Sequence, residues 1–277
     1  MNSAIRQTIA TMEHIVGGTL AYFMYDVKTR QVTGHRTDEP RAAASTYKLP
    51  VLIHCALLVE EGKLSWNKSF QLQEKLKSRG TGILKDLSVG MVLTLRDVCY
   101  LMIALSDNTA TDILIDCLGI ESVNRRLNDL GCSVTRLERQ IFPPNLERRP
   151  PLAAGMTTPG EMGGLLLDLV QGKLAGAEAT QTMLWMLSAQ QDRSMIPRYL
   201  PAGWLYAGKT GSNSDLRADV GLVTSPVGDQ VVLAMFCEHS QTADWSVESP
   251  GTLALARLAR HLLVGEGGES SSFCRSG

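Results

Sequence analysis

The sequence predicts an α+β fold, with an antiparallel five-stranded sheet flanked by helices and a separate all-helical lobe. Three observations indicate this fold. Strand-like runs occur near the two ends of the chain, apolar residues recur at helical spacing through its middle, and further helical segments lie at both ends. Because both groups of strands need partners, we expect them to meet in one sheet while the middle forms the helical lobe.

The N-terminal elements begin with an amphipathic helix over residues 3–16, which ends at Gly17 and Gly18. Two strand-like runs follow at 19–27 and 31–35, and the polar residues between them are typical of a hairpin. Helical spacing then continues from Thr46 to about Gln190. The clearest helical segments are 49–64, 94–108, 108–119, 121–131 and 158–174.

The segment from Phe142 to Pro159 is expected to be a long loop, because its prolines fit neither a helix nor a central strand. Three more strand-like runs follow at 204–211, 218–225 and 230–239, and a helix over 250–264 closes the fold.

We expect residues 1–265 to form one unit. The predicted parts are a sheet lobe at about 1–44 and 191–265, a helical lobe at about 45–190, and a disordered Gly- and Ser-rich tail over 266–277. A cleft between two lobes is a common place for a small-molecule site.

Composition narrows the classes of partner. The chain has 277 residues and a formal net charge of -1, which leaves no excess positive charge to neutralise phosphates, so nucleic acid is not an expected partner. No apolar run is long enough to span a membrane. We expect a monomer that binds a small-molecule or peptide-like substrate. No signal peptide is recognisable, which indicates a periplasmic or secreted protein if one was removed and a cytoplasmic protein otherwise.

Cysteine and histidine spacing predicts neither a metal site nor a cofactor site. The histidines show no metal-binding spacing, and Gly-rich phosphate motifs are absent. Free, mostly buried thiols are the favoured state of the six cysteines. The one disulfide we consider joins Cys55 and Cys99, because both lie in helical segments that we expect to pack together.

The motif S-x-x-K, formed by Ser45 and Lys48, opens a predicted helix. This spacing places a hydroxyl and an amine one helical turn apart, where a partly desolvated lysine can take the proton of a serine nucleophile. Taken alone, the motif also fits a helix N-cap followed by a solvated lysine.

Two further motifs favour the catalytic interpretation. Ser106, Asp107 and Asn108 spell S-D-N at the end of an apolar helical run, and K-T-G begins at Lys209 on a late strand. With these three motifs in this order, the chain resembles the class A β-lactamases and the related penicillin-binding DD-peptidases over roughly residues 3–265. The resemblance implies a β-lactamase/transpeptidase-like fold and a serine acyl-transfer enzyme.

The resemblance also implies roles for individual residues. Ser45 would be acylated, Lys48 would help to deprotonate it, and Ser106 would relay a proton to the leaving group. Lys209 and Thr210 would bind the substrate carboxylate, and Gly211 would let its strand pass close to the ligand. The backbone N–H groups of Ser45 and Ser212 would form the oxyanion hole, and Asn108 would bind the substrate's amide side chain. Arg217 is either a second cation for the carboxylate or a solvated strand arginine.

One family feature is missing. The loop glutamate that activates the hydrolytic water in β-lactamases follows a stretch that here reads Arg136 to Arg139, and its position is occupied by Ile141. Asn145 resembles the loop asparagine of the family, whereas no aspartate precedes Thr157.

Glu138 and Glu147 are the nearest carboxylates in the sequence. We favour ion pairs with neighbouring arginines for both, Glu138 with Arg136 or Arg139, over a catalytic role.

Two functional hypotheses follow. The first is a serine hydrolase that forms an acyl-enzyme with β-lactams or related carboxylate-bearing amides and esters, without the usual deacylating glutamate. The second is a DD-peptidase-like, penicillin-binding or sensor protein that is acylated but deacylates slowly. Both use the same acylation residues and differ in turnover.

Overall fold

The computed structural model describes residues 3–140, 154–239 and 244–265. Its largest sheet has five antiparallel strands in the order β2-β1-β10-β9-β8, so strands from both ends of the chain are neighbours, as predicted. The strands are β1 (Gly18–Asp26), β2 (Val32–His35), β8 (Leu205–Ser212), β9 (Leu216–Thr224) and β10 (Gln230–His239).

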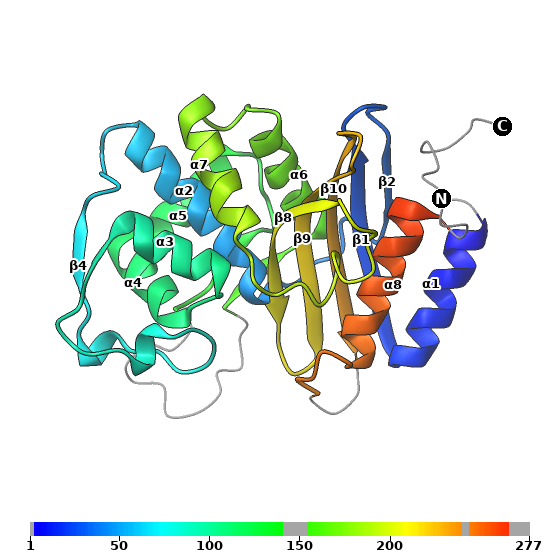
Figure 1. Cartoon of the computed structure of the whole chain (residues 1–277), viewed down its shortest axis with the longest axis horizontal. Coiled ribbons are helices and arrows are strands. Elements are labelled where there is room, and N and C mark those ends of the chain that lie inside the picture. The colour runs from blue at the N-terminus through cyan, green and yellow to red at the C-terminus, as the bar shows by residue number, and fades with distance from the viewer. Residues whose placement is uncertain (1–2, 141–153, 240–243, 266–277) are drawn as a thin grey trace.

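Helices cover both faces of this sheet. Helices α1 (Ser3–Val16) and α8 (Pro250–Val264) lie side by side on one face, and α6 (Pro159–Val170) packs against the other (Figure 1). Helix α8 begins where Ser249 Oγ accepts a hydrogen bond from the Thr252 N–H and Pro250 occupies the first turn.

The remaining helices form the other side of the molecule, beside β8 (Figure 1). They are α2 (Lys48–Glu60), α3 (Leu95–Ala104), α4 (Asn108–Leu118), α5 (Ile120–Asp129) and α7 (Ala177–Ser188). Helix α2 is buried along most of its length because its apolar residues are distributed all round it. It therefore holds Lys48, its first residue, in a fixed place.

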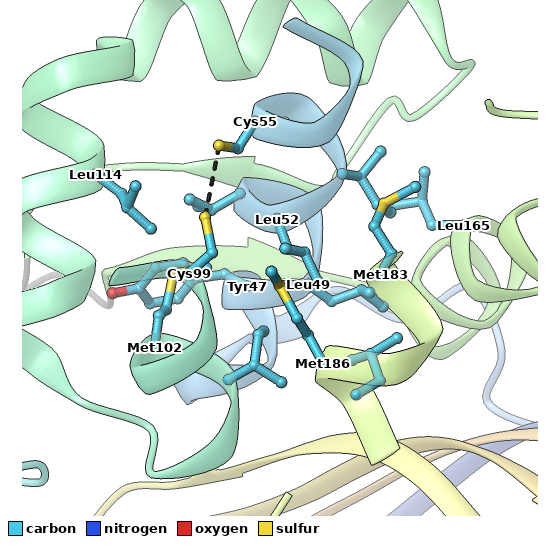
Figure 2. Close-up of a cluster of buried hydrophobic side chains, with 14 of the residues drawn as sticks. Tyr47, Leu49, Leu52, Cys55, Cys99, Met102, Leu114, Leu165, Met183 and Met186 are labelled. Atoms are coloured by element: carbon cyan, nitrogen blue, oxygen red, sulfur yellow. Dashed lines mark hydrogen bonds between the residues drawn. The ribbon is translucent and has the colours of Figure 1, made fainter. Parts of the chain in front are cut away.

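Figure 2 shows the core around α2, where Leu49 and Leu52 lie near Met186 of α7. Cys55 and Cys99 are buried free thiols with their sulfur atoms 3.5 Å apart, and Cys99 donates its hydrogen to Cys55. The described cysteines are all free, as we expected, whereas Cys274 lies outside the described residues.

The loop predicted from Phe142 to Pro159 is wrong at its C-terminal end. There β7 (Gly155–Thr157) is the central strand of a small sheet, between β3 (Arg41–Ala42) and β6 (Arg136–Leu137). The prolines that argued against a strand lie before this segment, and its residues keep the N–H groups that a ladder needs. Pro159 occupies the first turn of α6, where its missing N–H is tolerated.

Other short elements were not predicted, because runs of two or three residues carry no clear periodicity. They are β3, β6, β4 (Ser69–Gln71), β5 (Val92–Thr94) and the 3₁₀ turns η2 (Glu74–Leu76) and η3 (Leu84–Asp86). None of the helices in the described ranges has the length and hydropathy of a membrane span. Residues 141–153 and the predicted disordered tail at 266–277 lie outside the described residues. The division into lobes at about residues 44 and 190 stays a prediction.

Candidate active site

Ser45 lies in the 3₁₀ turn η1 (Ala44–Tyr47), which connects β3 to α2. The turn begins with strain, because Ala44 has φ of 44°, a left-handed conformation that a residue with a Cβ adopts at a cost of about 1–2 kcal/mol. The Thr46 hydroxyl donates to the Ala43 carbonyl at 2.6 Å and helps to hold the turn. Ser45 is half-buried at the end of this rigid segment.

Strand β8 passes close to Ser45 at Gly211. A Cβ atom added to Gly211 would lie 2.9 Å from the Ser45 nitrogen and 3.0 Å from the Thr46 nitrogen, so only glycine fits without a shift. This contact brings the backbone of Gly211 and Ser212 beside the backbone of Ser45, the two segments whose N–H groups the sequence predicts as the oxyanion hole.

Lys48 is fully buried and joins the first motif to the second. Its Nζ donates to the Ser106 carbonyl at 2.8 Å, the Ser106 hydroxyl at 3.0 Å and Asn108 Oδ1 at 2.9 Å. Burial and the nearby charge of Lys209 lower the pKa of Lys48 well below its usual range, against the raising effect of Asp107 and Asp112. This shift favours the neutral amine, which is the form that can accept a proton.

The S-D-N motif connects α3 to α4 rather than simply ending a helix. Ser106 has φ of 54°, and Asp107 caps α4 by accepting from the Ala110 N–H at 2.9 Å. The second carboxylate oxygen of Asp107 accepts from the Ile83 and Leu84 N–H groups at 2.7 and 2.9 Å. Asp107 therefore fixes the segment that presents Ser106 and Asn108.

Asn108 is nearly buried beneath the site. Its Oδ1 accepts from Lys48 and, at 3.3 Å, from Thr81 Oγ1, and its Nδ2 donates to the Arg79 carbonyl at 2.9 Å. An amide nitrogen carries two hydrogens, so one remains beyond the bond to Arg79 for a substrate carbonyl.

Lys209 and Thr210 of the K-T-G motif are buried on β8. Lys209 Nζ donates to the Thr210 carbonyl at 2.7 Å. Burial lowers the pKa of Lys209 to about 7, while the negative charges of Asp192 and Asp219 oppose that effect. The site thus contains two buried amines, one on α2 and one on β8.

Comparison with known proteins decides the family. A model described as the "Beta-lactamase enzyme family" matches residues 3–264. The chain belongs to this family.

Similar proteins span nearly the whole chain. A β-lactamase of Streptomyces fradiae is 28% identical and covers 92% of this chain and 84% of its own length. The crystal structure of a β-lactamase from Sphaerobacter thermophilus is 32% identical, with a TM-score of 0.85 over 95% of this chain and 96% of that one. PBP-A, at 23% identity and a TM-score of 0.80 over 92% of this chain and 93% of that one, shares the fold. The family, fold class and serine hydrolase class predicted from the sequence are confirmed.

Arg217 is not the solvated arginine that we considered as one alternative. It is 2% exposed and donates to the Asn213 and Leu216 carbonyls at 2.6 and 2.8 Å. It also donates to the Asp244 carbonyl, and its guanidinium lies 5.4 Å from the centre of the Trp245 ring. These contacts hold it beside the end of β8, where Ser212 pairs with it across the ladder. Its carboxylate-binding role stays a prediction.

The structure describes only some of the loop residues that the sequence analysis considered for release of an acyl group. Ile141, Asn145 and Glu147 lie outside the described residues. Glu138 accepts from Arg136 Nε at 2.5 Å, which is the ion pair that we expected.

Two polar residues around the site, one buried and one exposed, were missed from sequence. Asp112, one helical turn beyond Asn108, accepts from the Ser78 hydroxyl at 2.5 Å. Its helical spacing from Asn108 could have indicated that both lie on one face. Thr81 donates to the Ser106 carbonyl at 2.8 Å from a loop whose approach no local pattern predicts.

Proposed function

We propose that this chain is a serine hydrolase that opens β-lactams or related carboxylate-bearing amides and esters through an acyl-enzyme on Ser45, and that it lacks the usual deacylating loop carboxylate. The observation that carries the proposal is the buried contact of Lys48 with Ser106 and Asn108. This contact joins the S-x-x-K and S-D-N motifs into one proton-transfer unit beside β8.

The acylation step follows from these groups. Lys48, as a neutral amine, takes the proton of Ser45 while the serine oxygen bonds to the carbonyl carbon. The negative charge on the carbonyl oxygen is stabilised by the backbone N–H groups of Ser45 and Ser212. The C–N bond then breaks, and Ser106 gives its proton to the leaving nitrogen and regains one from Lys48, 3.0 Å away.

Substrate orientation depends on β8 and its neighbours. Protonated Lys209 and the Thr210 hydroxyl bind the carboxylate, Arg217 adds a second positive charge, and Asn108 binds the amide side chain. Burial of Lys209 strengthens the attraction because little water screens it. We expect a substrate analogue without the carboxylate to acylate the enzyme less efficiently.

The second half-reaction differs, because a base must activate water to release the acyl group. Isoleucine at position 141 cannot accept a proton, so we expect slow release. This favours, as a second candidate, a DD-peptidase-like or penicillin-binding protein whose acyl-enzyme persists. A leucine-to-glutamate variant of PBP-A has been crystallised as an acyl-enzyme with penicillin G. That protein has the same fold as this chain.

A chromogenic cephalosporin separates the two candidates when colour and protein mass are followed together. Steady turnover supports the hydrolase, whereas one equivalent of product with a lasting mass increase supports the penicillin-binding protein. Ser45→Ala should abolish both signals, and acylation that survives it would show that Ser45 is not the nucleophile.

Ile141→Glu tests the assignment of the missing base. We expect the acylation rate to change little and release to become faster, because a carboxylate can accept the proton of water. Ile141→Gln is the matched control, since it is isosteric with glutamate but cannot act as a base. Equal release rates for both variants would refute the assignment.

A further inference from the structure

A buried carboxylate lies behind the K-T-G strand and has no role in the proposed chemistry. Asp219 on β9 is 0% exposed and pairs with Thr210 across the β8–β9 ladder. Directly opposite residues of an antiparallel pair project to the same face, so Asp219 lies beside the Thr210 side chain. A carboxylate without solvent needs specific partners.

Two donors from different segments bind Asp219. The Tyr206 hydroxyl donates to Oδ1, and the Ile196 N–H donates to Oδ2 at 2.9 Å. Tyr206 lies three residues before Lys209 on β8, whereas Ile196 belongs to the segment between α7 and β8. Asp219 therefore connects three parts of the chain behind the substrate-binding strand.

Two paired glycines make room for the Tyr206 ring. Gly208 and Gly221 are register partners two positions from the Thr210 and Asp219 pair, and a Cβ on either would collide with Tyr206. The ring thus lies along the sheet with its hydroxyl directed at Asp219. This arrangement is built from both strands rather than from one side chain.

The segment that Asp219 anchors carries a second carboxylate. Asp192 lies four residues before Ile196 and accepts from the Ser194 N–H and hydroxyl at 3.0 and 2.7 Å. Both carboxylates act on Lys209, raising its pKa against the effect of burial. Loss of the Asp219 side chain would remove one negative charge near Lys209 and would also free the Ile196 segment, which carries Asp192.

We propose that Asp219 is a positioning residue for substrate binding, which acts through Lys209 and Thr210 by supplying a buried negative charge and by holding Tyr206 and the Ile196 segment in place. The inference rests on the proposed function, because it assumes that Lys209 binds the substrate carboxylate as a cation. The proposal adds to the binding site a residue, Asp219, that lies in none of the three sequence motifs.

The charged groups around Lys209 and Asp219 determine in which direction the pKa of Lys209 moves when Asp219 is replaced. Those facing Lys209 are Lys48 on α2, Asp192 before β8 and Asp219 on β9, and those facing Asp219 are Tyr206, Lys209 and Asp192, with Arg193 over the Tyr206 ring. Burial lowers the pKa of Lys209 to about 7 and raises that of Asp219 to about 7. Removing the carboxylate charge therefore leaves the effect of burial less opposed, so Lys209 loses its proton at lower pH.

The test is the pH dependence of acylation by penicillin G, followed by protein mass in rapid-quench experiments. In Asp219→Asn we expect the alkaline limb of the pH profile of acylation efficiency to move to lower pH by roughly one unit. The decrease in efficiency should come mainly from weaker substrate binding. Asp229→Asn is the matched control, because that carboxylate lies before β10, away from the site, and pairs with Lys28. Its profile should equal the wild-type profile.

Two further measurements keep the result interpretable. Tyr206→Phe removes a donor that favours the ionised form of Asp219, so it should move the limb in the same direction by less, and it serves if Asp219→Asn does not fold. Penicillin G methyl ester, which has no carboxylate, should show no such movement. An unmoved alkaline limb in the folded variants would overturn the inference, whereas a wild-type protein that is never acylated would overturn the proposed function instead.

Discussion

Gly211→Ala tests whether the close approach of β8 to the nucleophile controls acylation. The added Cβ would lie 2.9 Å from the Ser45 nitrogen and 3.1 Å from the Ala44 Cβ. The first contact is about 0.5 Å or more inside the optimum for non-bonded heavy atoms, so β8 and η1 must move apart. Because Ala44 already has a left-handed backbone, we expect most of the movement in β8. That movement would displace the Ser212 N–H from its place in the predicted oxyanion hole.

Loss of one oxyanion donor typically slows acyl transfer by roughly 10²- to 10³-fold, or about 2.7–4 kcal/mol in the barrier. We expect a decrease in this range for the acylation rate with a chromogenic cephalosporin. Gly164→Ala on α6 is the control, since a Cβ there meets no atom within 4 Å, and it should acylate normally. Acylation of Gly211→Ala at the wild-type rate would refute the predicted oxyanion hole.

Three other predictions follow from the described contacts. Asp107→Ala should lower the free energy of unfolding by about 2–4 kcal/mol in urea titration, because a helix cap and two further N–H partners are lost. Burial lowers the pKa of His54 from 6.5 to about 4, so stability should fall as pH drops through that interval, and His54→Gln should flatten this part of the stability profile. Lys209→Met removes a charge that lowers the pKa of Lys48, so the pKa of Lys48 should rise. With penicillin G methyl ester as the substrate, the acid limb of the pH profile of acylation should therefore move to higher pH. An unmoved acid limb would contradict the coupling between the two lysines.

The sequence predicted the long elements and the motif residues for the same physical reason. A run of eight or more residues carries a clear hydrophobic period, and a motif such as S-x-x-K keeps its chemistry within one helical turn. The strand at Gly155–Thr157 is too short to show a period, so the prolines before it dominated the prediction.

The supporting residues of the site are harder to predict because they depend on register. Nothing local to Asp219 shows that it will lie opposite Thr210, since that pairing is set by the turn between β8 and β9. The burial of Arg217 likewise depends on residues 244 and 245, distant in sequence. The role of Asp107 was within reach, because an aspartate directly before a helical run is a common N-cap.

In the proposed mechanism, acylation and release depend on different segments of this chain. The acylation groups are held by hydrogen bonds between α2, the α3–α4 connection and β8, and by the packing of Gly211 on η1. In the proposed mechanism residue 141 takes no part in acylation, and its side chain bears on water activation alone. We therefore expect a substitution there to change the lifetime of the acyl-enzyme and to leave the rate of its formation nearly the same. Asp219, by contrast, is proposed to act on the binding of the substrate and not on its release. We therefore expect the side chain at position 141 to decide whether this fold serves as a hydrolase or as a long-lived acyl acceptor.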